Sequence, residues 1–524
     1  MKLSVRRWPP VSVLLAALVV ASCIRPEPSR YADGMRRGVP ENEGVHSHGI
    51  IDFLEEVDNH GLELHSFMFL RHNRVIAEGW WHPYKPSAPH IMHSVSKTFT
   101  ATAIGFAVKE KLLSVDDRVI SFFPDELPPA VSPHLEKLSI KHLLTMTAGH
   151  EAAPEFHMSD SNWVRSFLAT PVANEPGTVF QYSSYASYML SAILQKASGL
   201  TAMEYLAPRL FEPLGVDGVK WEEGAQGVSA GGWGMHIRTA DMAKLGQFYL
   251  QKGKWNKKRL LPEEWIKEAT AVRIYQVDNP TFEQEMYDDW AQGYAYQLWR
   301  STHNAYRADG ANGQFIIVMP DQDAVIAITA RVSDTRKVLS LLWEHLFPSI
   351  MDRPLRENPR ANDMLVSKLA SLRIPDPVRT WEELFIFKEI RRSFAMEPNE
   401  RQITDVTFVF NEEGGCLFSF TDDKGTASFV FGQDRWMYGE TERLSPYFLN
   451  PRRNPAGAPP FAVAGYSGWP ANSQLELRLL YLDDTTSETY SCSFGRLEAD
   501  VEISISNSER PREAPLVLKG KRQQ

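Results

Sequence analysis

Hydrophobic and polar residues follow one another over residues 62–81 in the order expected of a β-hairpin. An apolar run at residues 67–70 is followed by polar residues at 71–74 and by a second apolar run at 75–77. Two short apolar runs on either side of a polar turn are typical of paired antiparallel strands. The pattern therefore predicts a hairpin here.

The pattern becomes helical after residue 94, where Phe99, Ala103 and Ala107 recur about once per helical turn. Similar spacing predicts helices over residues 140–146, 185–197, 239–250 and 335–346, and strands over residues 314–319 and 324–329. Strands at both ends of a region, with helices between them, favour an antiparallel sheet packed against helices. We therefore expect a mixed α/β (α+β) domain over residues 46–350.

A second domain is predicted in the last third of the chain. Residues 351–375 contain scattered proline, arginine and asparagine, which favours a linker. The remainder alternates in the manner of strands at residues 406–410, 416–420, 427–431, 475–482, 489–494 and 501–506. This spacing predicts an all-β domain over residues 376–520, as a small sandwich or a barrel.

The first residues predict a targeting segment. A basic start is followed by an apolar run over residues 11–21, too short to span a bilayer as a helix, so cleavage is favoured over anchoring. The run ends in Val-Ala-Ser-Cys at residues 20–23, which resembles the lipobox of bacterial lipoproteins. The resemblance implies that residues 1–22 are removed and that Cys23 is acylated. An ordinary signal peptide with an incidental cysteine is the alternative.

An acylated Cys23 predicts an exported lipoprotein that is held at the membrane of the bacterial cell envelope. Ile24 follows the cysteine, which in a Gram-negative host resembles the sorting pattern for the periplasmic side of the outer membrane. Residues 23–45 are rich in proline, serine, arginine and glycine and lack periodicity. We expect them to form a tether between the anchor and the folded domains.

Composition narrows the function classes only slightly. The 524 residues include 43% hydrophobic and 23% charged residues, an ordinary globular balance, and the net charge of -9 disfavours nucleic-acid binding. The other two cysteines, Cys416 and Cys492, are either a disulfide, which export would permit, or free buried thiols. The histidines are scattered without helical metal-ligand spacing, so neither a metal nor another cofactor is expected.

The chemistry-bearing motif is Ser-x-x-Lys, formed by Ser94 and Lys97 at the start of the predicted helix. A spacing of three places both side chains on one helical face. A serine hydroxyl becomes a nucleophile when a neighbouring base takes its proton, and a lysine can be that base when burial lowers its pKa. By itself the motif is weak, because an N-cap serine with a surface lysine gives the same pattern.

The surrounding segments make the motif specific. Residues 138–149 (LSIKHLLTMTAG) resemble the ITIRHLLTHTSG segment of the serine β-lactamase and penicillin-binding-protein superfamily. Residues 176–184 (PGTVFQYSS) resemble its PGTxFxYSN segment, and residues 231–243 resemble its GGLxSTAxDLARF segment. The resemblance covers most of residues 45–350, in an order similar to the class C branch and its esterase relatives. It implies an active serine hydrolase with Ser94 as nucleophile.

The same resemblance assigns further roles. Tyr182 matches the tyrosine that assists proton transfer at the nucleophile. The third catalytic motif, normally Lys-Thr-Gly or His-x-Gly, corresponds to Ala308-Asp309-Gly310. The backbone N–H groups of Ser94 and Ala311 would then form the oxyanion hole.

Two positions depart from the family pattern. Ser184 replaces the asparagine after the tyrosine, and Ala308 replaces the cation of the third motif. Loss of a cation removes a charge-assisted hydrogen bond to an anionic substrate, which disfavours a penicillin or D-Ala-D-Ala substrate. The departures resemble the esterase and 6-aminohexanoate-dimer hydrolase branch. Candidate substrate contacts are Ser184, Asp309 and Gly310, although for Asp309 a role in shaping the turn is favoured over a contact with a substrate amine.

Three functions stay open at this point. The first is hydrolysis of a small ester or amide through an acyl-Ser94 intermediate. The second is cell-wall or β-lactam hydrolysis, and the third is a catalytically silent binding or scaffold protein of the envelope. His93 adjoins the nucleophile but is expected to have a packing or surface role.

Overall fold

In the computed structural model, the hairpin predicted over residues 62–81 is formed by strands β2 (Glu63–Arg71) and β3 (Arg74–Trp80). His72 and Asn73 connect the strands and both have positive φ angles, as a tight two-residue hairpin turn requires. The structure describes residues 33–154, 160–277, 280–375, 390–411, 414–443, 460–471, 473–496, 499–508 and 514–523.

The hairpin lies inside a sheet that has seven strands in the described part of the chain, in the order β1-β3-β2-β12-β11-β10-β9. β2 pairs antiparallel with β12 (Ala324–Arg331), which pairs antiparallel with β11 (Gln314–Met319). β10 (Tyr306–Gly310) and β9 (Trp299–Arg300) complete this side. Strands from both ends of the region thus form one sheet, as the sequence pattern predicted.

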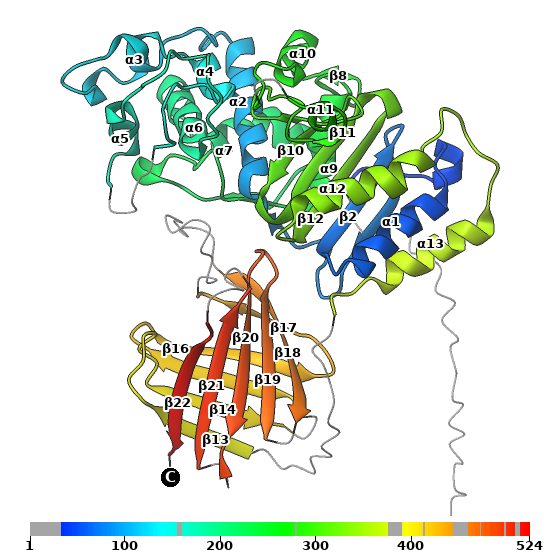
Figure 1. Ribbon diagram of the computed structural model, residues 1–524, viewed down its shortest axis with the longest axis vertical. Helices are drawn as coiled ribbons and strands as arrows, with labels where there is room; N and C mark the ends of the chain where they lie inside the picture. The colour runs from blue at the N-terminus through cyan, green and yellow to red at the C-terminus, as the bar shows by residue number, and fades with distance from the viewer. Residues whose placement is uncertain are drawn as a thin grey trace, which may run out of the picture. The chain divides into compact units, whose positions relative to one another are not determined.

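Helices cover both faces of the sheet (Figure 1). α9 (Thr239–Leu250) packs on one face, and α1 (Ser47–Asn59) and α12 (Thr335–Leu341) pack on the other side. The alternation of a strand supplies a core on each face. Along β2, Met68 belongs to the core on the α9 side, whereas Phe69 belongs to the core on the α1 side.

α2 (Ser96–Lys109) is the central helix on the α9 side. Its residues from Ser96 to Ala107 are all buried, as expected of a helix that has other elements on every side. It packs against α6 (Ser184–Ser198) and α7 (Ala202–Leu206) and contacts β10. Burial of the whole helix fixes the residues at its N-terminus relative to the sheet.

The remaining elements of this part are short. They are α3 (Pro133–Lys137), α4 (Ile140–Leu144), α5 (Trp163–Ala169), α8 (Glu212–Leu214), α10 (Glu263–Thr270), α11 (Phe282–Tyr287), β4 (His90–Ile91), β5 (Lys220–Trp221), β6 (Met235–Ile237), β7 (Lys254–Trp255) and β8 (Lys258–Arg259). β4, β6 and β5 form a small antiparallel sheet next to the start of α2.

Over its described residues, the predicted all-β domain is a barrel of ten strands. The strands are β13 (Ile390–Met396), β14 (Asp405–Phe410), β15 (Cys416–Asp422), β16 (Gly425–Gln433), β17 (Met437–Thr441), β18 (Phe461–Ala471), β19 (Gln474–Tyr481), β20 (Ser487–Phe494), β21 (Asp500–Asn507) and β22 (Leu516–Arg522). A pairing between β16 and β18 joins the two ends of the sheet. Aromatic side chains such as Phe408, Phe418 and Tyr490 fill its core.

Two predicted boundaries need correction. Part of the predicted tether is folded, because β1 (Arg36–Arg37) pairs with β3 and the buried carboxylate of Glu41 accepts hydrogen bonds from Ser47. Part of the predicted linker is α13 (Pro359–Ser371), which packs on α1 and β3. The sequence did not indicate β1 because a strand of two residues shows no hydrophobic period. It did not indicate α13 because a proline at a helix start is also typical of a linker.

The candidate disulfide is not formed. Cys416 on β15 and Cys492 on β20 are both free and buried, so the alternative of free thiols holds. Burial raises the pKa of both thiols, which keeps them protonated and unreactive.

The predicted signal segment and Cys23 lie outside the described residues. Among the helices that the structure does describe, none is both long and apolar enough to cross a bilayer.

Candidate active site

Ser94 lies in a 3₁₀ turn, His93–Val95, immediately before α2. The helix itself begins at Ser96, two residues later than the sequence motif suggests. The Ser96 hydroxyl donates to the carbonyl of His93 at 2.7 Å and accepts from the backbone N–H of Met235 at 3.2 Å. These bonds fix the turn against β6 and hold the Ser94 side chain at the end of a rigid helix.

Lys97 is buried in the first turn of α2, with 1% of its surface exposed. Its Nζ donates to the Ser94 hydroxyl at 2.9 Å, to the Ser184 hydroxyl at 3.0 Å and to the Gly232 carbonyl at 2.7 Å. These partners are all uncharged. Burial therefore disfavours the ammonium form and lowers the pKa of Lys97 to about 7.

The three partners also decide where a neutral Lys97 would direct its lone pair. A neutral amine has two N–H donors and one lone pair. The Gly232 carbonyl can only accept, so it retains one N–H, whereas each hydroxyl can donate or accept. The lone pair can thus face the Ser94 hydroxyl at 2.9 Å, which is the arrangement that a general base needs.

Two glycines bring the Gly232 carbonyl to Lys97. A Cβ on Gly232 would lie 2.6 Å from the Ser184 carbonyl oxygen, and one on Gly231 would lie 2.6 Å from that of Ser187. Gly231 also has a φ angle of 68°, which side chains rarely tolerate. The glycines of this motif therefore allow the loop to approach α6 closely enough to contact the lysine.

Tyr182 lies beside the same group. Its ring centroid is 4.9 Å from Lys97 Nζ and 5.6 Å from the ring of Trp299. Burial raises the pKa of Tyr182, the hydrogen bond with Ser94 lowers it and the charge of Asp309 raises it, with a net shift well above the ordinary value. At neutral pH the phenol keeps its proton, so Lys97 rather than Tyr182 is the group that can take one.

The end of β10 closes the site on the other side. β10 contacts the turn that carries Ser94, and a Cβ on Gly310 would lie 2.5 Å from the carbonyl oxygen of Met92. The absence of a side chain at Gly310 permits this close approach. Ala311 follows at once, so its backbone N–H lies next to the Ser94 turn, where backbone donors could stabilise an oxyanion.

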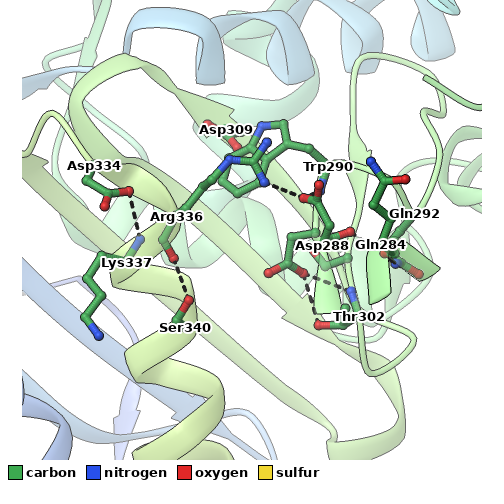
Figure 2. Close-up of polar contacts among 12 residues, drawn as sticks. Gln284, Asp288, Trp290, Gln292, Thr302, Asp309, Asp334, Arg336, Lys337 and Ser340 are labelled. Carbon is green, nitrogen blue, oxygen red and sulfur yellow. Dashed lines mark hydrogen bonds and ion pairs between the residues drawn. The ribbon is translucent and has the colours of Figure 1, made fainter. Parts of the chain in front are cut away.

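Asp309, one candidate substrate contact, is already engaged by the protein. Its carboxylate accepts from Arg307 Nε at 2.9 Å, and Arg307 is fully buried. Arg336 and its partner Asp288 lie nearby, beside Trp290 (Figure 2). Burial raises the pKa of Asp309 although both arginines lower it. These contacts favour a structural role in the turn.

Ala308, the position of the family cation, faces the helices. It is 2% exposed and belongs to the core on the α9 side, where it packs near Thr98 and Leu245. The site therefore has no cationic side chain at this position.

The sequence pattern of the Beta-lactamase family matches residues 54–344, more than half of the chain. The chain belongs to this family.

Several proteins are similar in sequence to this member of the Beta-lactamase family, and their names differ. A 6-aminohexanoate-dimer hydrolase of Paenarthrobacter ureafaciens is 24% identical over 229 residues, 39% of this chain and 57% of the relative. A lovastatin esterase of Penicillium rubens is 23% identical over 172 residues, 27% of this chain and 42% of the relative. A protein of Alkalihalophilus pseudofirmus is 24% identical over 236 residues, 40% of this chain and 65% of the relative. The matches thus span less than two thirds of these relatives.

Solved structures resemble the chain at lower identity. A penicillin-binding protein homologue from Caulobacter crescentus has a TM-score of 0.47 and 16% identity, covering 59% of this chain and 99% of its own. An octameric penicillin-binding protein homologue from Pyrococcus abyssi has a TM-score of 0.46 and 15% identity, covering 90% and 99%.

The structure of this Beta-lactamase family member brings Ser94, Lys97, Tyr182 and Ser184 together next to Gly310 and Ala311. Sequence reasoning missed the Gly232 carbonyl, although the double glycine was a usable signal. It also missed Arg307, which donates a hydrogen bond to the Asp309 carboxylate. The contact of His93 with Thr485 of the barrel was missed as well. A contact between residues so far apart leaves no local pattern.

Proposed function

We propose that the protein is a serine hydrolase that cleaves ester or small amide bonds through an acyl-Ser94 intermediate. The observation that carries this proposal is the buried Lys97, which contacts the Ser94 hydroxyl and, among the described residues, forms hydrogen bonds only with uncharged groups. The match to the Beta-lactamase family, whose members include hydrolases, supports it.

In the acylation step, Ser94 Oγ attacks the substrate carbonyl carbon as Lys97 Nζ takes the hydroxyl proton. The carbonyl oxygen becomes an oxyanion that the backbone N–H groups of Ser94 and Ala311 stabilise. When the carbonyl re-forms, the bond to the leaving group breaks. The leaving alcohol or amine receives the proton from Lys97 through the Tyr182 hydroxyl, which burial keeps protonated.

Deacylation uses the same groups with water as the nucleophile. Lys97 takes a proton from the water as its oxygen attacks the acyl carbon, and a second oxyanion forms between the two N–H groups. Collapse breaks the bond to Ser94 Oγ, which regains a proton from Lys97. The product is a carboxylic acid and the enzyme returns to its initial protonation state.

The substrate class follows from the altered positions. Ala308 is buried among apolar side chains, so no cation at this position could hold the carboxylate of a penicillin or a D-Ala-D-Ala peptide. Ser184 contacts Lys97 at 3.0 Å where the family has an asparagine that holds a substrate amide. An uncharged ester or small amide needs neither the cation nor the asparagine. Relatives named as a dimer hydrolase and an esterase support this substrate class.

The test compares p-nitrophenyl butyrate hydrolysis by the wild type, Ser94→Ala and Ser191→Ala. Loss of the nucleophile should lower turnover by a factor on the order of 10³ or more. Ser191 is the matched control, because its buried hydroxyl has no hydrogen-bond partner among the described residues. Intact mass of the wild type should show a butyryl adduct that Ser94→Ala lacks.

Full turnover by Ser94→Ala would overturn the proposal. A wild type that neither turns over the ester nor reacts with a fluorophosphonate probe would favour a binding protein. A stable adduct with penicillin would instead favour the cell-wall class.

A further inference from the structure

The loop between β19 and β20 of the barrel is buried although it is polar. Asp483, Asp484, Thr485 and Thr486 have exposed fractions of 6%, 1%, 1% and 1%. Connections between strands normally run over the surface, because their backbone polar groups need water. Burial of this loop means that protein groups, rather than water, surround it.

Those protein groups belong to the active-site region. The carbonyl of Asp483 accepts from the backbone N–H of Ile91 at 3.0 Å. The Thr485 hydroxyl accepts from Asn312 Nδ2 at 3.1 Å and lies 3.3 Å from Nε2 of His93. One hydroxyl of the barrel thus bridges two residues that are more than 200 positions apart in the sequence.

The two bridged residues flank the proposed oxyanion hole. His93 immediately precedes Ser94, and Asn312 immediately follows Ala311. Both have left-handed backbone conformations, with φ angles of 44° and 62°. Such conformations are strained for residues other than glycine, and they persist where the surroundings hold them. The Thr485 hydroxyl is a contact that both residues share.

The barrel has other contacts that hold this loop in place. Arg478 on β19 donates to the Pro375 carbonyl at 2.9 Å and lies 3.4 Å from the Glu63 carboxylate on β2. Leu480 and Leu482, on either side of the loop start, belong to the same apolar core as Trp81 of the sheet region. Apolar packing with a charged contact is typical of a fixed interface.

We propose that Thr485 is a positioning residue, through which the barrel holds His93 and Asn312 and so sets the spacing of the Ser94 and Ala311 N–H groups. Its effect on turnover rests on the proposed function. Its effect on the backbone does not. The barrel thereby takes part in the active site without contacting the substrate.

The experiment compares Thr485→Val, Thr485→Ser and Thr486→Val in the full chain. Valine keeps the shape of threonine and removes the hydroxyl, whereas serine keeps the hydroxyl. Thr486 is the matched control, because it is equally buried in the same loop and its Oγ1 has no hydrogen-bond partner among the described residues. Hydrogen exchange is followed by mass spectrometry in peptides that cover residues 91–95 and 310–313.

We expect faster exchange in both peptides for Thr485→Val, wild-type exchange for Thr486→Val, and recovery in Thr485→Ser. In p-nitrophenyl butyrate hydrolysis, kcat of Thr485→Val should fall about tenfold, as for the loss of one well-placed hydrogen bond, while KM changes little. A general loss of stability would affect Thr486→Val equally.

Unchanged exchange in both peptides of Thr485→Val would overturn the positioning role, whatever the activity. Equal acceleration in Thr486→Val would overturn it as well. Altered exchange restricted to Thr485→Val, in a protein whose wild type shows no turnover, would uphold the positioning role and count against the hydrolase.

Discussion

Among the described residues, two lysines are buried, and they differ in what faces their amines. Lys244 on α9 donates to the Asp241 carboxylate at 3.0 Å and to the Gly215 carbonyl at 2.7 Å. Lys97 on α2 donates to two serine hydroxyls and one carbonyl. Both lysines are held by hydrogen bonds, but only the first has a carboxylate among these partners.

The difference separates a structural lysine from a candidate base. The ion pair of Lys244 with Asp241 lies within α9, and the hydrogen bond from Lys244 to the Gly215 carbonyl ties this helix to the neighbouring loop. Burial destabilises the charged form of a lysine that has no opposite charge nearby. The pKa of Lys97 therefore falls to about 7. Burial alone therefore does not mark a catalytic lysine, whereas burial without a counter-charge beside a hydroxyl does.

The largest expected effect comes from removing the candidate base, Lys97. Lys97→Met fills a similar volume and removes the base, so we expect kcat to fall by a factor on the order of 10²–10⁴. The fold should remain, since methionine is accepted in buried helices. Ester turnover and far-UV circular dichroism measure the two outcomes. Turnover within threefold of the wild type would show that Lys97 is not the base.

The second prediction concerns the structural lysine, Lys244, and the free energy of unfolding. Asp241→Asn removes the carboxylate that accepts from Lys244 and from Arg238. It leaves the Lys244 ammonium buried without that partner, which should lower the free energy of unfolding by about 3–5 kcal/mol. Turnover per folded molecule should stay near that of the wild type. Urea denaturation of Asp241→Asn and of the double variant Asp241→Asn/Lys244→Met tests this. The double variant should recover part of the loss, and no recovery would mean that the pair is not the cause.

Much of the fold was predictable where a segment keeps the same hydrophobic period along its whole length. Residues 239–250 and 314–319 have the predicted bounds of α9 and β11, because each is an uninterrupted run: the apolar residues of α9 face one core, and β11 is buried on both faces. β18 was missed because Gly465, Gly468 and Pro470 interrupt its apolar run. Such interruptions normally indicate turns, and only the neighbouring strands keep this segment extended.

The site was predictable as far as side chains in motifs define it. Ser94, Lys97, Tyr182 and Ser184 were expected together and do lie together. The Gly232 carbonyl and the Thr485 hydroxyl were not expected, because a carbonyl carries no residue identity and the barrel loop has no sequence relation to the motifs. The spacing of Asp241 and Lys244 on the predicted helix is compatible with their pairing, but the lack of a carboxylate beside Lys97 depends on the tertiary structure.

The smallest effect concerns the pH at which Lys97 loses its proton. The base must be neutral, so kcat/KM should rise about tenfold per pH unit below about 7 and level off above it. The pKa of Tyr182 lies well above its ordinary value, so the phenol does not contribute to this rising limb. The Ser184 hydroxyl accepts a hydrogen bond from Lys97 Nζ at 3.0 Å, and a bond of this kind favours the charged form.

Ser184→Ala removes that acceptor and should lower the pKa of Lys97 further, moving the rising limb to lower pH. The variant should therefore lose less activity relative to the wild type at pH 6 than at pH 8, even though its plateau falls. Profiles of kcat/KM between pH 5.5 and 9 measure the shift, with Ser191→Ala as the control that leaves the limb in place. A limb that moved to higher pH in Ser184→Ala would mean that the hydroxyl does not stabilise the ammonium form. The contrast between the two lysines would then rest on the Asp241 carboxylate alone.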